Sequence, residues 1–418
     1  MTLKLGIIAD DFTGATDIAS FMATAGWKVI QMNGTPSETL DTAGLDAIVI
    51  SLKSRSCPSS EATTLCRLAA QWLIKHGCQR LYFKYCSTFD STPEGNIGPV
   101  TDMLLHLTQL NLAVLCPALP VNGRTVEAGH LFVHGQLLNE SGMQNHPLTP
   151  MTDANLMRVM EKQASGTCGL VPLSSVHAGK DAIRARLQSL EEAGKHYAVL
   201  DAVTEDDLLT LAAALPDRVL LTGGSGLAGA LAMLHPGNGL SKDVVVSGME
   251  GKAIVLAGSC SVMTNQQVQY YRQLAPARAV EVERAINDSS AYIQELVDWY
   301  LEYAGPLAPM IYATCSAEEV KAIQACYGVK AAGSAIENLF ALLAIRLNQF
   351  GVNKFIVAGG ETSSLLVQRL NVASFTIGES IAPGVPWVKD IKRPLWLALK
   401  SGNFGDESFF SKAQESFS

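Results

Sequence analysis

The sequence has no apolar run of the roughly 18 residues needed to span a bilayer, and no basic segment followed by an apolar stretch opens it. We therefore expect neither secretion nor membrane insertion. The chain also has no excess of positive charge, because 31 Lys and Arg face 39 Asp and Glu for a net charge of -8. This balance argues against nucleic acid or an anionic membrane as the main partner and favours a small molecule.

The cysteines show no paired spacing. The nine residues, at positions 57, 66, 78, 86, 116, 168, 260, 315 and 326, include no C-x-x-C pair, and their number is odd. Such a pattern fits neither a disulfide framework nor a zinc site and is typical of a cytoplasmic protein. His130 and His134 lack the glutamate of the H-E-x-x-H motif. No metal ligands are predicted.

The Walker A pattern G-x-x-x-x-G-K-[ST] is absent as well, which disfavours a P-loop NTPase. A G-x-G-x-x-G match at residues 224–229 leaves a nicotinamide-dependent sugar-acid dehydrogenase as an alternative. The helical pattern behind this match soon meets Pro236, and Asp243 precedes the next apolar run, whereas a dinucleotide fold has its acid at the end of that strand. The match is therefore a weak signal.

Strand-like and helix-like patterns alternate along the 418 residues, a length that favours two domains. Alternation of this kind indicates βαβ units and a mostly parallel sheet covered on both faces. Pro and Gly cluster at residues 235–242, and the alternation resumes after them. We predict an α/β fold of two domains, residues 1–240 and 250–418, each with a mostly parallel sheet flanked by helices. The patterns used are the apolar runs at 47–50, 81–83, 112–115, 197–200, 253–257, 310–312, 354–358 and 395–399, and the helical ones at 61–76, 100–110 and 180–193.

Asp10 and Asp11 follow the first apolar run directly and precede a helical pattern. They should lie at the carboxyl end of a strand, where open α/β sheets bind ligands. Either residue alone could simply cap the helix. Two neighbouring carboxylates repel each other and raise each other's pKa, and Asp17 follows about a turn later. A cation or a hydroxyl-rich partner would relieve this repulsion.

Basic side chains follow the next strands in the predicted order, at Lys53, Arg55, Lys84 and Arg124. Each could be a solvated loop residue, since Lys and Arg are common on surfaces. Together they fall near the same sheet edge as the two aspartates. Cations beside carboxylates suit a ligand that carries one carboxylate and several hydroxyls.

Two strand-turn-helix elements stand out in the second predicted domain. Gly258 and Ser259 follow one strand, and residues 359–363 follow another. Small residues let phosphate oxygens approach the N–H groups at a helix start, although the glycines could merely form the turns. Gly402 follows the last strand and could close the same cleft. These turns predict a nucleotide or polyphosphate site.

Six segments together resemble the four-carbon acid sugar kinases, and the resemblance covers nearly the whole chain. They are DDFTGA at 10–15, KYCSTFDST at 84–92, GNIG at 95–98, PALPVNGR at 117–124, GSCS at 258–261 and GGETS at 359–363. The resemblance implies an N-terminal domain that binds a four-carbon sugar acid and a C-terminal domain that binds ATP, used with Mg²⁺. The active site would lie in the cleft between them. It also implies transfer of the γ-phosphoryl group to the terminal 4-hydroxyl, with 3-oxo-tetronate as the expected acceptor.

Residue by residue, the resemblance places contacts to the sugar acid on Asp10, Asp11, Arg55, Lys84 and Asp90. It places nucleotide contacts on Ser259, Gly359, Gly360, Glu361, Thr362, Ser363 and Gly402. Neither likeness nor spacing decides which carboxylate deprotonates the hydroxyl; we prefer Asp11, then Asp10, then Asp90. A non-enzymatic sugar-acid-binding protein stays open as an alternative, and a homo-oligomer is expected only on general grounds.

Overall fold

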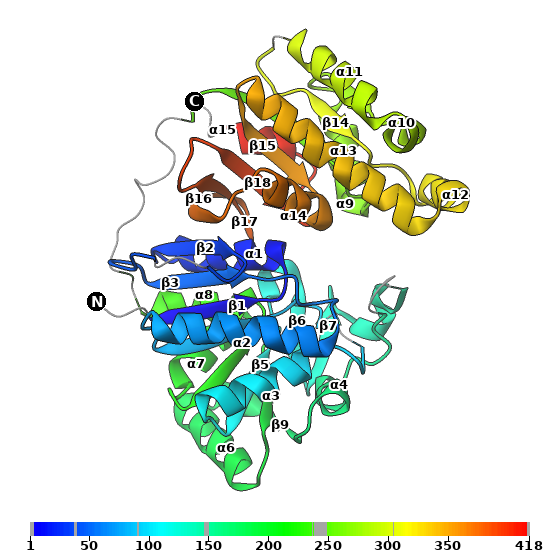
Figure 1. Ribbon diagram of the computed structural model, residues 1–418. Coiled ribbons are helices and arrows are strands. Elements are labelled where there is room, and N and C mark those ends of the chain that lie inside the picture. Colours follow the sequence, from blue (N-terminus) through cyan, green and yellow to red (C-terminus); the bar gives the residue numbers. More distant parts are fainter. Residues whose placement is uncertain are drawn as a thin grey trace. The chain divides into compact units, whose positions relative to one another are not determined.

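The computed structural model describes residues 4–36, 40–89, 92–145, 150–235, 237, 249–303 and 305–415. The chain divides into two compact units, Met1–Lys242 and Asp243–Ser418, called here the first and second unit (Figure 1). Each unit contains a mostly parallel sheet with helices packed on it. The prediction of an α/β fold with two such domains is confirmed.

The main sheet of the first unit is parallel throughout, in the order β2-β3-β1-β4-β11-β5-β10-β9. Its central strands are short, apolar and fully buried, as expected for a parallel sheet covered on both faces. The strands are β1 (Leu5–Ala9), β2 (Val29–Asn33), β3 (Ala47–Ser51), β4 (Arg80–Lys84), β5 (Leu112–Cys116), β9 (Cys168–Val171), β10 (Tyr197–Leu200) and β11 (Val219–Gly223).

Helices connect these strands and form two groups. Crossovers between parallel strands are right-handed, so connections that run in opposite directions along the sheet place their helices on opposite faces. Accordingly α1 packs with α8, α8 with α7 and α7 with α6, whereas α2 packs with α3 and α3 with α4. The helices are α1 (Phe12–Thr24), α2 (Ser59–Lys75), α3 (Ile97–Thr108), α4 (Leu156–Gln163), α5 (Leu173–His177), α6 (Lys180–Glu192), α7 (Glu205–Ala214) and α8 (Ser225–Leu234).

The neighbouring strands β1 and β4 form the point where the sheet changes direction. From β1 the chain crosses toward β2, and from β4 it crosses the other way toward β5. Ligands of open α/β sheets bind at such a switch point, outside the carboxyl ends of the strands. The residues directly after β1 and β4 are therefore well placed to meet a ligand.

A small antiparallel sheet of the first unit was not predicted from the sequence. It has the order β6-β7-β8 and consists of β6 (Arg124–Glu127), β7 (His130–Val133) and β8 (Gln136–Leu137). These strands are too short to show a clear alternation. They place Arg124 at the start of β6.

The sheet of the second unit has the order β13-β14-β12-β15-β18-β17-β16. Its first five strands are parallel, and β17 runs antiparallel to both of its neighbours, β18 and β16. The strands are β12 (Lys252–Ala257), β13 (Ala277–Ala279), β14 (Met310–Tyr312), β15 (Val352–Ala358), β16 (Ser374–Ala382), β17 (Val385–Asp390) and β18 (Trp396–Lys400). The helices are α9 (Val262–Tyr271), α10 (Val282–Asn287), α11 (Ser289–Leu301), α12 (Ala317–Tyr327), α13 (Val329–Gln349), α14 (Gly360–Arg369) and α15 (Phe409–Glu415).

This second sheet has its own switch point, between β12 and β15. The chain leaves β12 toward β13 and leaves β15 toward β16, at the other end of the sheet. The turns after β12 and β15 are the two glycine-containing turns that the sequence singled out. The topology brings them next to each other at the carboxyl edge.

No single helix in the described ranges is long and apolar enough to cross a membrane. One bent pair of helices, Glu318–Tyr327 with Lys330–Gln349, meets the requirement by length and composition alone, with an angle of 103° between its members.

Candidate active site

The loops that follow β1, β3 and β4 are tied to one another by main-chain hydrogen bonds. The amide of Asp10 donates to the carbonyl of Lys84 at 3.0 Å. The carbonyl of Asp10 accepts from the amides of Ser54 and Arg55 at 3.0 and 3.2 Å. Asp10, Arg55 and Lys84 are thus gathered at the switch point of the first sheet.

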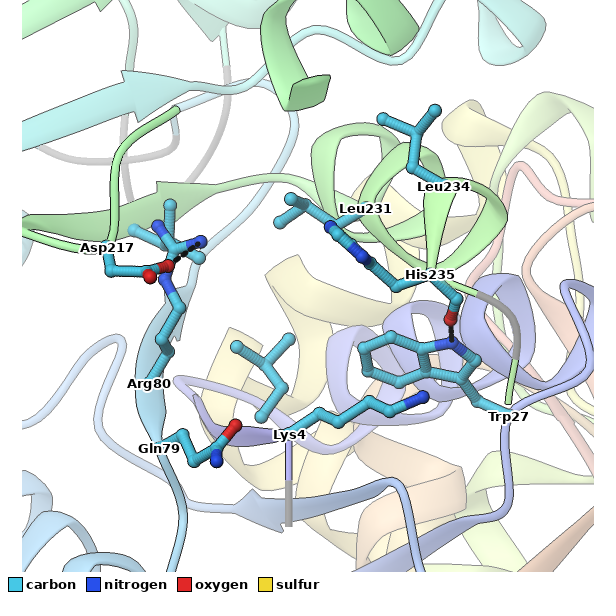
Figure 2. A pocket seen from close by; sticks show the side chains of 10 residues that line it. Lys4, Trp27, Gln79, Arg80, Asp217, Leu231, Leu234 and His235 are labelled. Carbon is cyan, nitrogen blue, oxygen red and sulfur yellow. Dashed lines mark hydrogen bonds and ion pairs between the residues drawn. The ribbon is translucent and has the colours of Figure 1, made fainter. Parts of the chain in front are cut away.

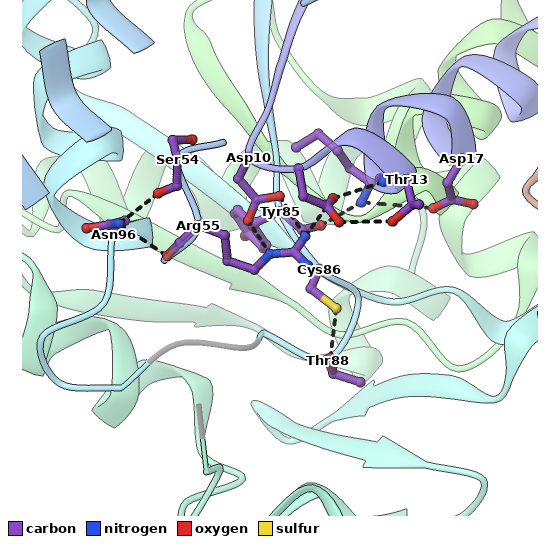
Figure 3. Close-up of polar contacts among 12 residues, drawn as sticks. Asp10, Thr13, Asp17, Ser54, Arg55, Tyr85, Cys86, Thr88 and Asn96 are labelled. Carbon is purple, nitrogen blue, oxygen red and sulfur yellow. Dashed lines mark hydrogen bonds and ion pairs between the residues drawn. The ribbon is translucent and has the colours of Figure 1, made fainter. Parts of the chain in front are cut away.

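Arg55 is the cation that the two neighbouring aspartates require. Its Nε and Nη2 donate to Asp10 Oδ2 and Oδ1 at 2.9 and 2.7 Å, and Nη2 also donates to Asp11 Oδ1 at 2.8 Å (Figure 3). A bidentate pair of this kind fixes both geometry and charge. Arg55 therefore orients the two carboxylates, and its direct contact with a sugar acid stays a prediction.

Asp11 also caps helix α1. Its Oδ1 accepts from the amide of Gly14 at 2.9 Å, and its Oδ2 accepts from the hydroxyl of Thr13 at 3.0 Å. The capping interpretation is thus right for Asp11, and the ion pair with Arg55 is present in addition. The Asp11 side chain is 28% exposed and that of Asp10 only 7%. Asp11 is the carboxylate of this pair that a ligand can reach more easily.

The environment separates the pKa values of the two aspartates. Burial raises the pKa of Asp10 above its ordinary value, and the charge of Arg55 offsets this only in part. For Asp11 burial acts in the same direction, but the charges of Arg55 and Lys84 and the hydrogen bonds from Thr13 and Gly14 lower its pKa. Neighbouring carboxylates with divergent pKa values are a common feature of acid-base sites. Asp11 is ionised at neutral pH.

Lys84 ends β4 and is buried beside the first turn of α1. Its Nζ donates to the carbonyl of Tyr85 at 2.8 Å and lies 3.9 Å from Asp17 Oδ2. A methyl group on Gly14 would lie 3.1 Å from Nζ and would clash with Asp11 Oδ1. The glycine is therefore needed for the close approach of lysine, helix and aspartate.

Asp17 and Ser225 complete this cluster, and sequence reasoning did not assign either of them to the site. The Ser225 hydroxyl donates to Asp17 Oδ2, while Asp17 Oδ1 is buried without a partner in the described structure. Burial raises the pKa of Asp17, and the positive charge of Lys84 lowers it in part. Spacing placed Asp17 one turn along the helix, but no local pattern predicts contact with Ser225, 208 residues away.

The G-x-G-x-x-G match serves the packing of α8. A methyl group on Gly226 would lie 2.6 Å from the carbonyl oxygen of Ala118, and one on Gly224 would lie 3.0 Å from that of Pro117. These glycines face protein backbone, which leaves no room for a dinucleotide against them. The observation speaks against the dehydrogenase alternative.

Asn96 supports the Arg55 loop from a neighbouring segment. Its buried Nδ2 donates to the carbonyls of Ser54 and Arg55 at 2.7 and 3.2 Å (Figure 3). It also donates to the carbonyl of Cys57 at 2.8 Å. From the sequence, Asn96 was interpreted only as part of a turn within the segment GNIG. Of the other predicted residues, Lys53 is exposed, Arg124 contributes its charge to the surroundings of Asp17, and Asp90 lies outside the described residues.

The two glycine turns of the second unit meet at its switch point. The amides of Gly258 and Ser259 both donate to the carbonyl of Ala358, at 2.9 and 3.1 Å. A methyl group on Gly258 would clash with Thr362 Oγ1, and one on Gly402 with Ser259 Oγ. Gly359 has a φ of +130°, which strongly favours glycine. The structure therefore brings together three loops that are far apart in sequence.

A pocket of about 320 Å³ opens beside these turns. Its lining combines predicted residues of the glycine turns with apolar side chains from α10, α12 and α13. A mixed lining of this kind suits a ligand that has both an apolar and a phosphorylated part. Ser363 and Gly402 are not part of the lining, and Ser363 is fully buried. The turn residues in the lining include Ser259, Gly359, Gly360, Glu361 and Thr362, and the apolar side chains include Val282, Val320, Ile323, Ala332 and Ile336.

A larger pocket of about 460 Å³ lies in the first unit but at the opposite edge of its sheet (Figure 2). Leu5 and Arg80, which begin β1 and β4, help to line it together with Trp27. None of the predicted site residues that the structure describes takes part in it. Because ligands of such sheets bind at the carboxyl ends of strands, this pocket is not the candidate active site.

Comparison with known proteins finds a matching family model for each of the two units. A family model described as a sugar-binding N-terminal domain matches residues 5–231, and one described as a nucleotide-binding C-terminal domain matches residues 254–410. A Salmonella typhimurium protein named 3-oxo-tetronate kinase is 53% identical over 418 residues, covering 99% of both chains. Proteins of the same name from Brucella melitensis and Haemophilus influenzae are each 52% identical and cover 99% of this chain and 95% and 100% of their own lengths.

Solved structures agree with this similarity. The crystal structure of a Salmonella typhimurium protein, 52% identical, matches with a TM-score of 0.91 and covers 99% of this chain and all of the other. A Haemophilus influenzae crystal structure, also 52% identical with the same coverage, matches with a TM-score of 0.82. The chain therefore belongs to the family of sugar-binding and nucleotide-binding proteins that includes the 3-oxo-tetronate kinases, the four-carbon acid sugar kinases.

Proposed function

We propose that this protein is an ATP-dependent kinase that transfers a phosphoryl group to the terminal 4-hydroxyl of a four-carbon sugar acid, 3-oxo-tetronate. The observation that carries this proposal is identity of about 52% over 99% of the chain to proteins named for that activity. Residues 1–240 would hold the acid and residues 250–418 the nucleotide. The site geometry of both units supports this division.

The acid would bind at the switch point of the first sheet. Lys84 supplies an ammonium beside the first turn of α1, suited to the carboxylate of the substrate. Asp10 and Asp11 are held by Arg55 and can accept hydrogen bonds from hydroxyls. Asp90, which lies outside the described residues, remains part of the proposal through the resemblance of its segment.

Asp11 would accept the proton of the 4-hydroxyl. Its side chain is the more exposed of the two aspartates, and its lowered pKa keeps it ionised at neutral pH. Such a carboxylate is a weak base, but phosphoryl transfer proceeds through a loose transition state and depends mainly on alignment and charge neutralisation. Asp10, buried and paired twice with Arg55, comes second.

ATP would place its base against the apolar side chains of α10, α12 and α13 in the 320 Å³ pocket, and its phosphates at the turns of Ser259 and residues 359–363. Gly402 would act indirectly, because its lack of a side chain lets its loop pack closely against Ser259. No group of three or more metal-ligating side chains is present in the described ranges. Mg²⁺ would therefore be held chiefly by phosphate oxygens, with the Glu361 carboxylate in the pocket available to it, and would neutralise phosphate charge.

The test is ADP release from Mg·ATP with a panel of four-carbon sugar acids and their 3-oxo forms, with five- and six-carbon acids as controls. We expect that, among the acids of the panel, only 3-oxo-tetronate stimulates ADP release, and that NMR finds the phosphate on its 4-hydroxyl. If ATP binds but none of the acids stimulates ADP release, the protein has a different acceptor. Failure to bind ATP would overturn the kinase function.

The same preparations separate the two alternatives. A dehydrogenase would change NADH absorbance in the presence of a sugar acid, and no such change is expected. A binding protein without enzymatic activity would bind the acid and leave ATP unchanged.

A further inference from the structure

A lysine lies fully buried beneath the nucleotide turns, and the proposed mechanism does not use it. Lys400 is the last residue of β18, and it pairs in register with Ala358, the last residue of β15. Ala358 is also the residue whose carbonyl binds the amides of Gly258 and Ser259. The lysine therefore sits at the carboxyl edge of the sheet, directly beside the switch point.

Every donor of the Lys400 ammonium is used, and each acceptor is a neutral oxygen. Nζ donates to Thr264 Oγ1 at 3.0 Å and to the carbonyls of Ser401 and Gly402 at 3.0 and 2.8 Å. The ring of Phe409 lies 5.9 Å from Nζ. The hydrogen bonds hold the ammonium in place, but none of their acceptors is an anion that would balance a positive charge.

No carboxylate of the described residues forms an ion pair with Lys400. Lys400 forms no ion pair within the part of the chain that the structure describes, in contrast to Arg55 and Lys84 of the first unit. Asp406, in the loop after β18, is paired with Lys412 instead. The titratable residues on the elements packed around Lys400 are Lys354 on β15, Lys389 and Asp390 on β17, Tyr270 and Tyr271 on α9, Glu361 and Arg369 on α14, and Lys412 and Glu415 on α15.

Burying a positive charge without an anion is costly, and a bound anion nearby would offset this cost. The loop of Ser401 and Gly402, which Lys400 binds, also packs closely against the turn that contains Ser259. A methyl group on Gly402 would clash with Ser259 Oγ and lie 2.8 Å from Ser261 Oγ. Thr264, which accepts from Lys400, donates in turn to the carbonyl of Gly402 at 2.8 Å and accepts from Ser261 Oγ at 3.1 Å. The ammonium is thus one layer of residues below the proposed phosphate site.

We propose that the buried Lys400 ammonium is the built-in counter-charge for the phosphates of the nucleotide, acting through the loop that carries Gly402. Lys400 does not touch the nucleotide, so it is a positioning residue whose charge acts across a low-dielectric layer. This inference rests on the proposed nucleotide site. It makes nucleotide binding and protonation of Lys400 mutually favourable.

The link between nucleotide binding and protonation of Lys400 can be measured near neutral pH. Burial lowers the pKa of Lys400 to about 7, so the side chain is only partly charged at neutral pH. A bound polyphosphate favours the ammonium form and raises this pKa. Binding should then take up a proton, and nucleotide affinity should fall by roughly tenfold between pH 6.5 and pH 8 as Lys400 loses its charge.

The experiment compares ADP binding by the wild type, Lys400→Arg and Lys400→Met from pH 6 to pH 8.5, by calorimetry in two buffers of different ionisation enthalpy. Titration of the phosphates of ADP is common to all three proteins, so differences between them report Lys400. The arginine variant keeps its charge across this range. We expect it to bind with less dependence on pH than the wild type, and the methionine variant to bind at least tenfold more weakly at pH 6.5.

A second measurement does not depend on the variants folding. NMR of lysine labelled with ¹³C at Cε follows the pKa of Lys400 in the wild type, with and without ADP. An upward shift on binding is the expected result, and an unchanged pKa would overturn the inference, as would equal affinity and equal pH dependence in a folded Lys400→Met variant. If the wild type does not bind ADP or ATP at all, the proposed function has failed instead.

Discussion

Arg55 donates from Nε and Nη2 to the two carboxylate oxygens of Asp10, at 2.9 and 2.7 Å, although 45 residues separate them in the chain. Nη2 is shared with Asp11. One guanidinium thus holds two adjacent carboxylates that would otherwise repel each other. The proposed acceptor site depends on this arrangement, because it fixes the position of the Asp11 carboxylate, whose side chain is 28% exposed.

Replacing Arg55 by lysine should damage the site although the charge is kept. A single ammonium cannot reproduce the planar fork that binds both oxygens of Asp10 and one of Asp11. We expect kcat/KM for the acid to fall by roughly tenfold or more, with little change in ATP affinity. Steady-state kinetics and ATP titration check this, and an unchanged kcat/KM would contradict the role given to Arg55.

Arg55→Met should in addition lower the free energy of unfolding by about 3 kcal/mol, because the buried carboxylates of Asp10 and Asp11 lose their positively charged partner.

Asp11→Asn should abolish transfer selectively. Asparagine keeps the helix cap but cannot accept the proton of the hydroxyl. We expect kcat to fall by roughly a hundredfold or more, the range for loss of a general base, while ATP affinity is unchanged. Asp217→Asn is the matched control, since its side chain is 94% exposed and lies far from the switch point. Normal turnover in Asp11→Asn would exclude Asp11 as the base.

Acid should reduce the stability that Asp11 contributes. The pKa of Asp11 in the folded protein lies below its ordinary value of 3.8, so its ion pair stabilises the fold above that value and is lost as pH falls through the folded pKa. We expect the wild type to exceed Asp11→Asn in free energy of unfolding by about 1–2 kcal/mol at pH 6. The gap should close as the pH falls below 3.8 and through the folded pKa. Urea unfolding at several pH values measures it, and a gap that does not depend on pH would contradict this account.

Changes in the glycine turns should weaken nucleotide binding alone. A methyl group on Gly402 would clash with Ser259 Oγ, and Gly360→Val adds bulk where α14 begins in the pocket. We expect Gly402→Ala, Gly360→Val and Ser259→Ala each to raise the KM for ATP by about tenfold, an effect of about 1.4 kcal/mol, with the KM for the acid nearly unchanged. Ser334→Ala, at an exposed position on α13 outside the pocket, is the control. Equal effects on both substrates would mean that the turns act on overall folding.

Nucleotide should protect one particular cysteine from alkylation. Cys260 is exposed and lines the 320 Å³ pocket, whereas Cys326 is exposed but does not line it. We expect ATP to slow iodoacetamide labelling of Cys260 several-fold and to leave Cys326 unchanged, as followed by peptide mass spectrometry. Buried Cys66 and Cys116 should react slowly throughout, because burial raises the pKa of each thiol to about 12. Equal rates at Cys260 with and without ATP would place the nucleotide elsewhere.

Local patterns were enough to find most of the fold. The apolar runs at residues 47–50 and 354–358 correspond to β3 and β15, and the helical pattern at 180–193 corresponds to α6. Period and burial are local properties, so they can be read without knowing the neighbours. The small sheet β6-β7-β8 and the antiparallel pairing of β16 with β17 were missed, because short strands and strand direction leave little local signal.

The site was predictable to the extent that its residues directly follow strands. Asp10, Lys84 and Ser259 were singled out for that reason, and the structure places each at a carboxyl edge. Ser225 and Lys400 were not singled out, because no local pattern in the sequence predicts their buried contacts. Arg55 was predicted to contact the sugar acid, and in the structure its partners are two aspartates of the protein itself.

Local sequence was enough to show which residues end a strand or begin a helix, and so to find the acidic turn of the first unit and the glycine turns of the second. Which of these turns meet depends on the packing of the whole chain. The order of strands in each sheet puts β1 beside β4 and β12 beside β15, and so brings Asp11 to Lys84 and Gly359 to Ser259. Backbone periodicity acts over a few residues, whereas strand order and burial of charge involve residues far apart in the chain.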